Sequence, residues 1–113
     1  MPAGSMRHHR HTVCQPAESD LLARARRHRR RGEHRRAMLV MKEICHRVLD
    51  DARLWTIYAV ACVRAGRRDE AADALKQALW LRQRDRHVDK ARVTRELLSG
   101  LLAGNASLRV AAA

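Results

Sequence analysis

Apolar residues between Leu54 and Leu81 recur at steps of three and four positions, which is the spacing of one face of an α-helix. The first part of this face consists of Trp55, Ile57, Tyr58, Ala61, Cys62 and Ala65. Gly66 then interrupts the pattern, and glycine can take the left-handed backbone conformation that commonly ends a helix. The helical step resumes with Ala71, Ala74, Leu75, Ala78 and Leu79. The pattern predicts two amphipathic helices joined by a tight turn.

The same pattern recurs 34 residues earlier in the chain. Moving back by this distance places Gly66 on Gly32, and it places Ala71, Leu75 and Ala78 on Ala37, Met41 and Ile44. Moving forward by the same distance places Gly66 on Gly100. We therefore predict that the three glycines mark equivalent bends in a stack of helix hairpins. The opening helix of the first copy is degenerate, since Trp55, Tyr58 and Cys62 correspond to Leu21, Arg24 and His28.

The pattern divides the chain into a helical domain and two terminal segments. We expect the domain at residues 18–103, and its elements are hairpins at about 19–49 and 51–83 and a capping helix at about 86–102. Residues 1–17 are expected to be a disordered, basic, histidine-rich tail, and residues 104–113 a frayed end.

Short polar side chains stand where three of these helices are expected to begin. Ser19 and Asp20 are predicted to cap the first helix, Asp50 and Asp51 the third, and Asp85 the last. Their oxygens can accept hydrogen bonds from the backbone N–H groups that a helix start leaves without partners.

The hairpin of residues 54–81 resembles the tetratricopeptide repeat. The resemblance is carried by Trp55-x-x-Tyr58-Ala59-x-x-Cys62, then Gly66, then Ala71-x-x-x-Leu75 and Ala78. Ala59 and Cys62 stand where the family prefers glycine and tyrosine, and Gln83 stands in place of its terminal proline, so the second helix is expected to run further. The resemblance implies an all-α fold, a right-handed superhelix of about five helices, with about two repeats and a C-terminal capping helix.

In such a stack the first helices of successive hairpins line a concave groove. The resemblance implies a partner-binding groove lined by Leu22, Arg26, Arg29, Arg30, Arg53, Thr56, Ile57, Val60, Val63, Arg64, Lys90, Thr94 and Leu97. This groove would be apolar in its middle and rich in arginine at one end, which suits an acidic and apolar peptide or helix. The leading hypothesis is therefore a non-catalytic protein–protein interaction module, an adaptor whose partner is a protein or peptide.

The formal net charge of +12 supports an alternative from another class. Arginine outnumbers lysine by 21 to 3, an excess that a GC-rich bacterial-type genome also produces. A polycation attracts nucleic acid over about a Debye length. The alternative is a nucleic-acid-associated basic protein that binds without sequence specificity through its tail and through Arg24, Arg26, Arg27, Arg29, Arg30 and Arg31. The structural interpretation of the same run is a solvated face on a degenerate repeat.

A third hypothesis is a self-associating structural adaptor. Two hairpins and a cap are close to the lower limit for a stable array, so an uncovered end could pair with its copy, and we expect a monomer or weak homodimer. No stretch is long and apolar enough to cross a bilayer, and the N-terminus lacks an apolar core behind its basic residues. We therefore expect a cytoplasmic location.

No arrangement of residues predicts catalysis, and we expect neither an enzyme nor a cofactor. Cys45 and His46 are neighbours that point about 100° apart on a helix, which is poor geometry for a nucleophile and its base. A zinc site is not expected either, because its potential ligands are crowded into one short segment at His8, His9, His11 and Cys14. Cys45 and Cys62 lie on apolar faces and are expected to be buried, reduced thiols.

Overall fold

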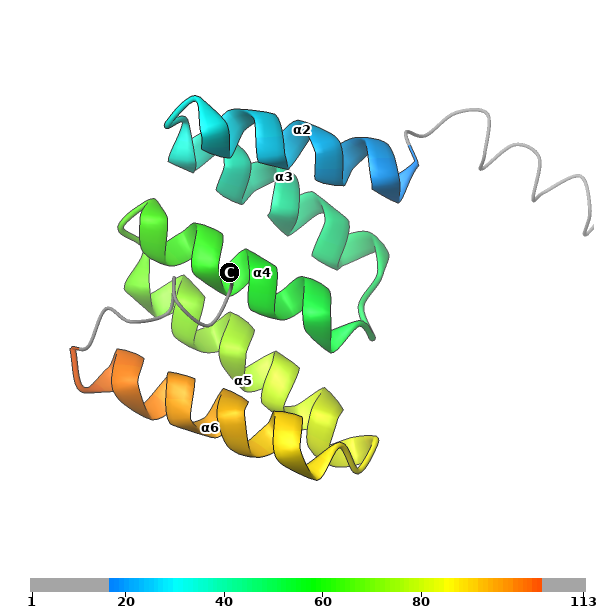
Figure 1. Cartoon of the computed structure of the whole chain (residues 1–113), viewed down its shortest axis with the longest axis vertical. Helices are drawn as coiled ribbons and strands as arrows, with labels where there is room; N and C mark the ends of the chain where they lie inside the picture. Colours follow the sequence, from blue (N-terminus) through cyan, green and yellow to red (C-terminus); the bar gives the residue numbers. More distant parts are fainter. Residues whose placement is uncertain (1–16, 105–113) are drawn as a thin grey trace, which may run out of the picture.

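The computed structural model describes residues 17–104, and this part of the chain is all α-helical (Figure 1). Its helices are α2 (Glu18–Arg30), α3 (His34–Arg47), α4 (Ala52–Arg64), α5 (Arg68–Arg84) and α6 (Val88–Leu102). Each helix packs against the next one in the sequence, which makes the fold a series of sequential antiparallel hairpins. The predicted all-α class with about five helices is confirmed.

The tail and the frayed end that the sequence predicts fall outside the described residues, apart from Ala17 and Gly104. Within residues 17–104, no helix combines the length and the apolar content that crossing a bilayer requires.

The seam between α4 and α5 is built from small side chains, which let two helix backbones approach closely. Ala59, Ala71 and Ala78 are fully buried there, and Leu75, on the same face of α5, is fully buried as well. The residues 34 positions earlier, Ala37, Met41 and Ile44, are also buried. The repeat predicted from the sequence therefore corresponds to a repeat in burial.

Gly32 and Gly66 end α2 and α4 in the same way. Their φ angles are 75° and 77°, in the left-handed region. In both turns the N–H group after the glycine donates to the carbonyl oxygen five residues before it, at 2.8 Å. This bond satisfies a carbonyl at the helix end, and the left-handed residue beside it is usually glycine. The two predicted bends are confirmed.

The third predicted bend, at Gly100, is wrong. Gly100 lies inside α6, and the chain turns from α5 to α6 at Arg86 instead. Arg86 is the one non-glycine residue of the described chain with a positive φ, 59°, and the N–H of His87 donates across it to the carbonyl of Arg82 at 2.9 Å. The next glycine with a positive φ is Gly104, after the end of α6.

Of the predicted helix caps, Asp51 is confirmed. Its Oδ1 accepts hydrogen bonds from the N–H groups of Arg53 and Leu54, at 3.0 and 3.3 Å. The tryptophan that follows, Trp55, donates from Nε1 to the carbonyl oxygen of Leu49 at 2.9 Å and so fastens the connection between α3 and α4.

The other two predicted caps are wrong. The residue before α2 is Ala17, and Ser19 and Asp20 already lie within the first turn of this helix. Asp85 follows the end of α5, pairs with Arg84 at 3.0 Å, and is separated from α6 by two further residues. A side chain can cap only from the position directly before the first helical residue, so a shift of one or two residues removes the bond.

Two arginines of α5 fasten α6. Nη1 of Arg82 donates to Oγ1 of Thr94 at 2.6 Å. Arg68, at the other end of α5, donates to the carbonyl oxygens of Leu101 and Gly104 at 3.2 and 3.3 Å. The carbonyl of Leu101 also accepts from the N–H of Gly104 at 3.1 Å, so the guanidinium group adds a second donor at the end of α6.

Candidate binding groove

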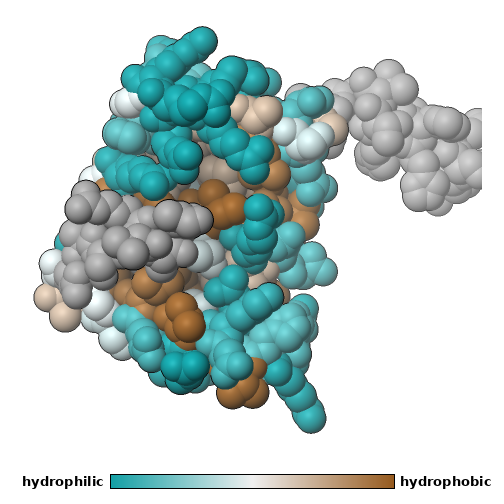
Figure 2. All heavy atoms as spheres, viewed as in Figure 1, coloured by the Kyte–Doolittle hydropathy of each residue, from teal (hydrophilic) through white to brown (hydrophobic). Residues whose placement is uncertain are grey.

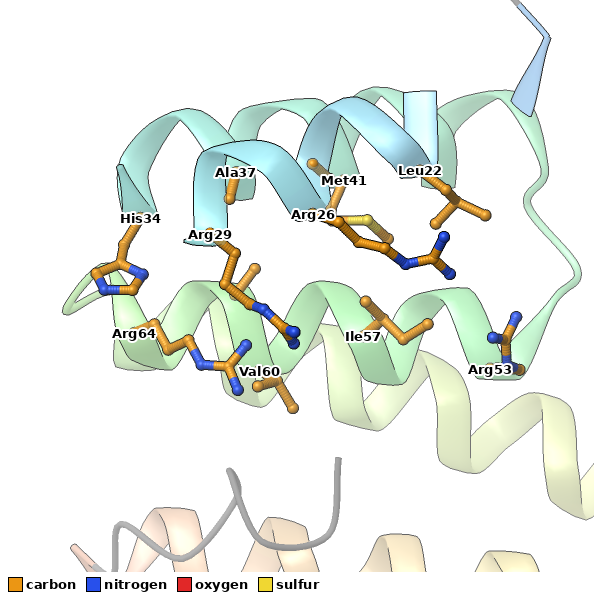
Figure 3. A pocket seen from close by; sticks show the side chains of 12 residues that line it. Leu22, Arg26, Arg29, His34, Ala37, Met41, Arg53, Ile57, Val60 and Arg64 are labelled. Carbon is orange, nitrogen blue, oxygen red and sulfur yellow. The ribbon is translucent and has the colours of Figure 1, made fainter. Parts of the chain in front are cut away.

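A cavity of about 180 Å³ opens between α2 and α4, with α3 as its floor (Figure 3). We call it the α2–α4 groove. It is lined by Leu22, Ala25, Arg26 and Arg29 of α2, by His34, Ala37 and Met41 of α3, and by Arg53, Ile57, Val60, Ala61 and Arg64 of α4.

The helical repeat explains why these side chains meet. On each helix the lining positions are three or four residues apart, so they project from a single face. The helices α2 and α4 open successive hairpins and therefore run in the same direction (Figure 1), and their lining side chains lie on either side of the groove (Figure 3). The groove thus follows from the hairpin order together with the apolar stripes of the sequence.

Four arginines surround an apolar centre in the groove, and no carboxylate of residues 17–104 lines it. Figure 3 shows Arg29 and Arg64 at one end, Arg26 and Arg53 toward the other, and Ile57 between them. The hydrophilic surface in Figure 2 is most continuous over the end of the stack that α2 forms, and apolar residues emerge beyond it. The groove therefore offers positive charge at both ends of an apolar floor.

The charges gathered in the groove affect the pKa of Arg64. Its pKa is lowered, first because its surroundings are partly dehydrated and then because the positive charge of Arg29 repels it. Other arginines of the described chain have carboxylate partners, such as Arg67, whose Nη2 lies 2.7 Å from Oε1 of Glu70. In the groove, no such partner offsets the repulsion.

His34 adds a polar atom without a partner. Its Nδ1 is shielded from solvent and makes no hydrogen bond within residues 17–104. Buried polar groups in native proteins nearly always have a hydrogen-bond partner, so an unsatisfied one calls for an explanation. Figure 3 shows this ring at the end of the groove that holds Arg29 and Arg64.

The structure brings seven of the thirteen groove residues expected from the sequence into this cavity: Leu22, Arg26, Arg29, Arg53, Ile57, Val60 and Arg64. Arg30, Thr56 and Val63 belong to the same two helices but do not line it. The hydroxyl of Thr56 donates to the carbonyl oxygen of Ala52 at 2.9 Å.

Lys90, Thr94 and Leu97 of α6 do not line the groove either. Thr94 is fully buried, where its hydroxyl contacts the carbonyl oxygen of Lys90 at 2.7 Å and accepts from Arg82. The predicted groove position of Thr94, which was obtained from the 34-residue spacing, is therefore wrong.

A difference in helix length explains this mistake. The helix α5 has 17 residues, whereas α3 has 14, and α6 begins 36 residues after α4 instead of 34. Two residues rotate a helix by about 200°, which exchanges its inner and outer faces. With the spacing of 36, Thr94 corresponds to the buried Tyr58 and the exposed Val93 corresponds to Ile57.

The residues that the sequence analysis missed are mainly those of the floor: Ala25, His34, Ala37, Met41 and Ala61. A signal for them exists in the sequence, because α3 has an apolar stripe wider than a single face. Such a helix is covered on two sides, here by α2 and by α4. His34 has no signal of its own, since its role depends on where α3 begins.

The remaining arginines of the α2 run face away from the groove. Arg24, Arg27, Arg30 and Arg31 are exposed, and none forms an ion pair with a described residue. They form a basic surface at the α2 end of the stack that is separate from the cavity.

Cys45 and Cys62 are fully buried free thiols. Burial raises the pKa of Cys45 to about 12 and that of Cys62 to about 11, so both are protonated at neutral pH. A protonated, buried thiol is a poor nucleophile and a poor metal ligand. This burial agrees with the expectation from the sequence.

Within residues 17–104, no three histidine, cysteine, aspartate or glutamate side chains come together as metal ligands do. His8, His9, His11 and Cys14, which the sequence analysis considered for zinc, lie outside the described residues. In comparisons with known proteins, no family model, no curated protein and no solved structure matches this chain.

Proposed function

We propose that this protein is a non-catalytic interaction module of the tetratricopeptide type, which binds an acidic and apolar peptide or helix in the α2–α4 groove. The observation that carries the proposal is the composition of the groove: four arginines border an apolar floor, and no lining residue is acidic. Complementary charge steers a partner and fixes its register, while apolar contact supplies affinity that salt does not remove.

The repeated hairpins support the tetratricopeptide assignment. Equivalent glycines with φ near 75° occur 34 residues apart, and the small residues of the family pattern, Ala59, Ala71 and Ala78, are fully buried. Ordinary members of that family act as protein-binding scaffolds, because their stacked helices form extended concave surfaces.

The test uses synthetic peptides in which two or three leucines are flanked by glutamates. Fluorescence anisotropy at physiological salt is expected to show binding of these peptides, but not of versions with lysine for glutamate or serine for leucine. Ile57→Asp should weaken binding by about tenfold or more, because it places a charge in the apolar centre. Leu39→Asp is the matched control, since Leu39 is an exposed apolar residue of α3 that does not line the groove.

The proposal is wrong if Ile57→Asp folds, as judged by circular dichroism, and still binds the peptides as the parent does. Ile57 is the better site for this change than its neighbour Val60, which is only 3% exposed and whose replacement by aspartate threatens the fold.

A second candidate function is nucleic-acid association through the basic surface at the α2 end. The observation in its favour is that Arg24, Arg27 and Arg30 are exposed, lie at steps of three residues along α2 and form no ion pair with a described residue. Such binding weakens steeply with salt, by about one order in affinity per order in salt concentration for each phosphate contact. Changing these three arginines to glutamine should reduce both the affinity for a single-stranded oligonucleotide and this salt dependence.

A further inference from the structure

One end of the α2–α4 groove gathers three basic side chains from three different helices. Arg29 comes from the last turn of α2, His34 is the first residue of α3, and Arg64 is the last residue of α4. All three line the cavity, and Figure 3 shows the ring of His34 at this end, with the side chains of Arg29 and Arg64 extending from it toward the middle of the groove. The turns that Gly32 and Gly66 form hold the neighbouring helix ends in place.

The charges at this end repel one another. The guanidinium groups of Arg29 and Arg64 are close enough for one to lower the pKa of the other, and no carboxylate lines the cavity to offset them. The positive end of the α3 dipole lies at the same place, since His34 begins that helix. Glu33, the residue before it, is held by His28 at 2.8 Å and by Arg36 at 3.4 Å.

The imidazole of His34 leaves a donor or acceptor unused. Its Nδ1 has neither solvent nor a protein partner within the described residues. An oxygen of a bound anion would supply that partner once the ring turns its Nδ1–H toward the groove, and it would also reduce the repulsion between the two arginines. One ligand group thus accounts for two unfavourable features of the unbound groove.

We propose that Arg29, His34 and Arg64 form an anion subsite that takes a dianionic phosphoryl group, carried by a phosphorylated serine or threonine of the bound peptide. The peptide part of this inference rests on the proposed function, whereas binding of the phosphoryl group alone does not. A monoester phosphate has two charges for the two guanidinium groups and three terminal oxygens for donors on three side chains. A carboxylate or a nucleic-acid phosphodiester has one charge and leaves one guanidinium uncompensated.

The first experiment uses the phosphoryl group without a peptide. N-acetylphosphoserine amide is titrated into the full chain while the arginine Nε–H and histidine ring signals are followed by NMR. Saturable shifts are expected at Arg29, His34 and Arg64, and none at Arg24, which carries the same charge outside the groove. Equal shifts at Arg24 and Arg64 would overturn the subsite, because they indicate general charge attraction.

The second experiment uses three peptides of the acidic and apolar type that differ at one position, with phosphoserine, glutamate or serine there. The phosphoserine peptide is expected to bind about tenfold or more tightly than the glutamate peptide. Arg64→Gln and His34→Ala should remove this preference, whereas Arg24→Gln, which loses the same charge as Arg64→Gln, should keep it. Equal binding of the phosphoserine and glutamate peptides would overturn the proposal.

The two experiments separate failure of the subsite from failure of the proposed function. If N-acetylphosphoserine amide shifts His34 and Arg64 but no peptide binds, the subsite stands and the peptide function fails. If the peptides bind at Ile57 without a preference for phosphoserine, the function stands and the subsite fails. If a single-stranded oligonucleotide shifts the same three residues more strongly than the phosphoserine compound, the phosphate source is nucleic acid and the phosphopeptide proposal is overturned.

Discussion

The two hairpins of this protein have the same turn and a common 34-residue spacing, but their first helices are held very differently. The helix α4 buries six of its 13 residues, whereas α2, of the same length, buries only Leu21 and Ala25. The helix α4 lies between α3 and α5, while α2 packs mainly against α3. An inner helix can therefore be apolar on two sides, and an outer helix is free to carry charge.

This difference bears on the groove, because α2 and α4 are its two walls. Local stability follows the number of buried apolar contacts, so the α2 wall should open more readily than the α4 wall. A partner that binds between them would then stabilise the weaker wall. Substitutions in the two hairpins can measure this difference in local stability.

The largest effect is expected from shortening the central leucines. Leu75 and Leu21 are both fully buried, and Leu75→Ala should lower the free energy of unfolding by about 2–5 kcal/mol, since it leaves a cavity in the α4–α5 seam. Leu21→Ala should mainly release α2, with a smaller change in the global transition. Urea unfolding and amide hydrogen exchange measure the two effects. Equal losses of protection in α2 and α4 for both variants would contradict the comparison.

Alkaline pH should weaken the inner hairpins by about 4 kcal/mol between pH 8 and 10.5, about 2 kcal/mol from each of two buried thiols. Folding raises the pKa of Cys45 and Cys62 from 9.0 to about 12 and about 11, because burial disfavours the thiolate. Groups with a raised pKa give stability that is fully present below the unfolded value and is lost as pH rises toward the folded values. Urea unfolding at several pH values measures the loss. Replacing both cysteines with alanine should remove most of this loss, and the buried Tyr58, whose pKa is also raised, should retain a smaller loss above pH 10. An unchanged profile would exclude the thiols as its cause.

Helix capping should produce a smaller difference in stability between α4 and α2, the first helices of the two hairpins. Asp51→Ala should cost about 1 kcal/mol, because the N–H groups of Arg53 and Leu54 lose their acceptor. Asp20→Ala in α2 should change stability by less than about 0.5 kcal/mol, since Asp20 makes no capping bond. Thermal unfolding of the two variants in parallel provides the measurement. A larger cost for Asp20→Ala would reverse this assignment.

A change of the opposite sign is expected at the turn between α5 and α6. Arg86→Gly should stabilise the protein by about 0.5–1 kcal/mol, because glycine takes a positive φ without the steric cost that Arg86 has at 59°. The opposite change, Gly66→Ala, should destabilise it by about 1–2 kcal/mol, although no atom would obstruct the added Cβ. Chemical unfolding measures both changes in the free energy of unfolding. A loss of stability in Arg86→Gly would show that the side chain of Arg86 stabilises the protein by more than its positive φ destabilises it.

The sequence predicts much of this fold because helix periodicity and glycine position are local signals. The five helices, the turns at Gly32 and Gly66 and the cap at Asp51 can all be recognised from residues close in the chain. The absence of proline at Gln83 also gives the longer α5 correctly. These features depend on backbone preferences and amphipathicity rather than on tertiary contacts.

The failures at α6 have one common cause, which is that a fixed spacing of 34 residues does not hold beyond α5. The additional length of α5 displaces α6 by two residues, so Gly100 falls within a helix and Thr94 turns inward. The groove floor at Met41 and the unpartnered nitrogen of His34 depend on how three helices meet. The periodicity of apolar residues within one helix does not specify how three helices pack together.

The hydrogen bonds from two arginines of α5 to α6 make the two outer helices, α2 and α6, differ in how firmly they are attached. Arg82 near one end of α5 and Arg68 at the other attach α6 at two well-separated places, whereas α2 has no comparable pair of polar attachments among the described residues. Of these two outer helices, α2 is thus the one that is less firmly attached to its neighbour. We therefore expect any movement that widens or narrows the cavity to be a motion of α2 rather than of α5 and α6, and amide hydrogen exchange that is faster in α2 would show it.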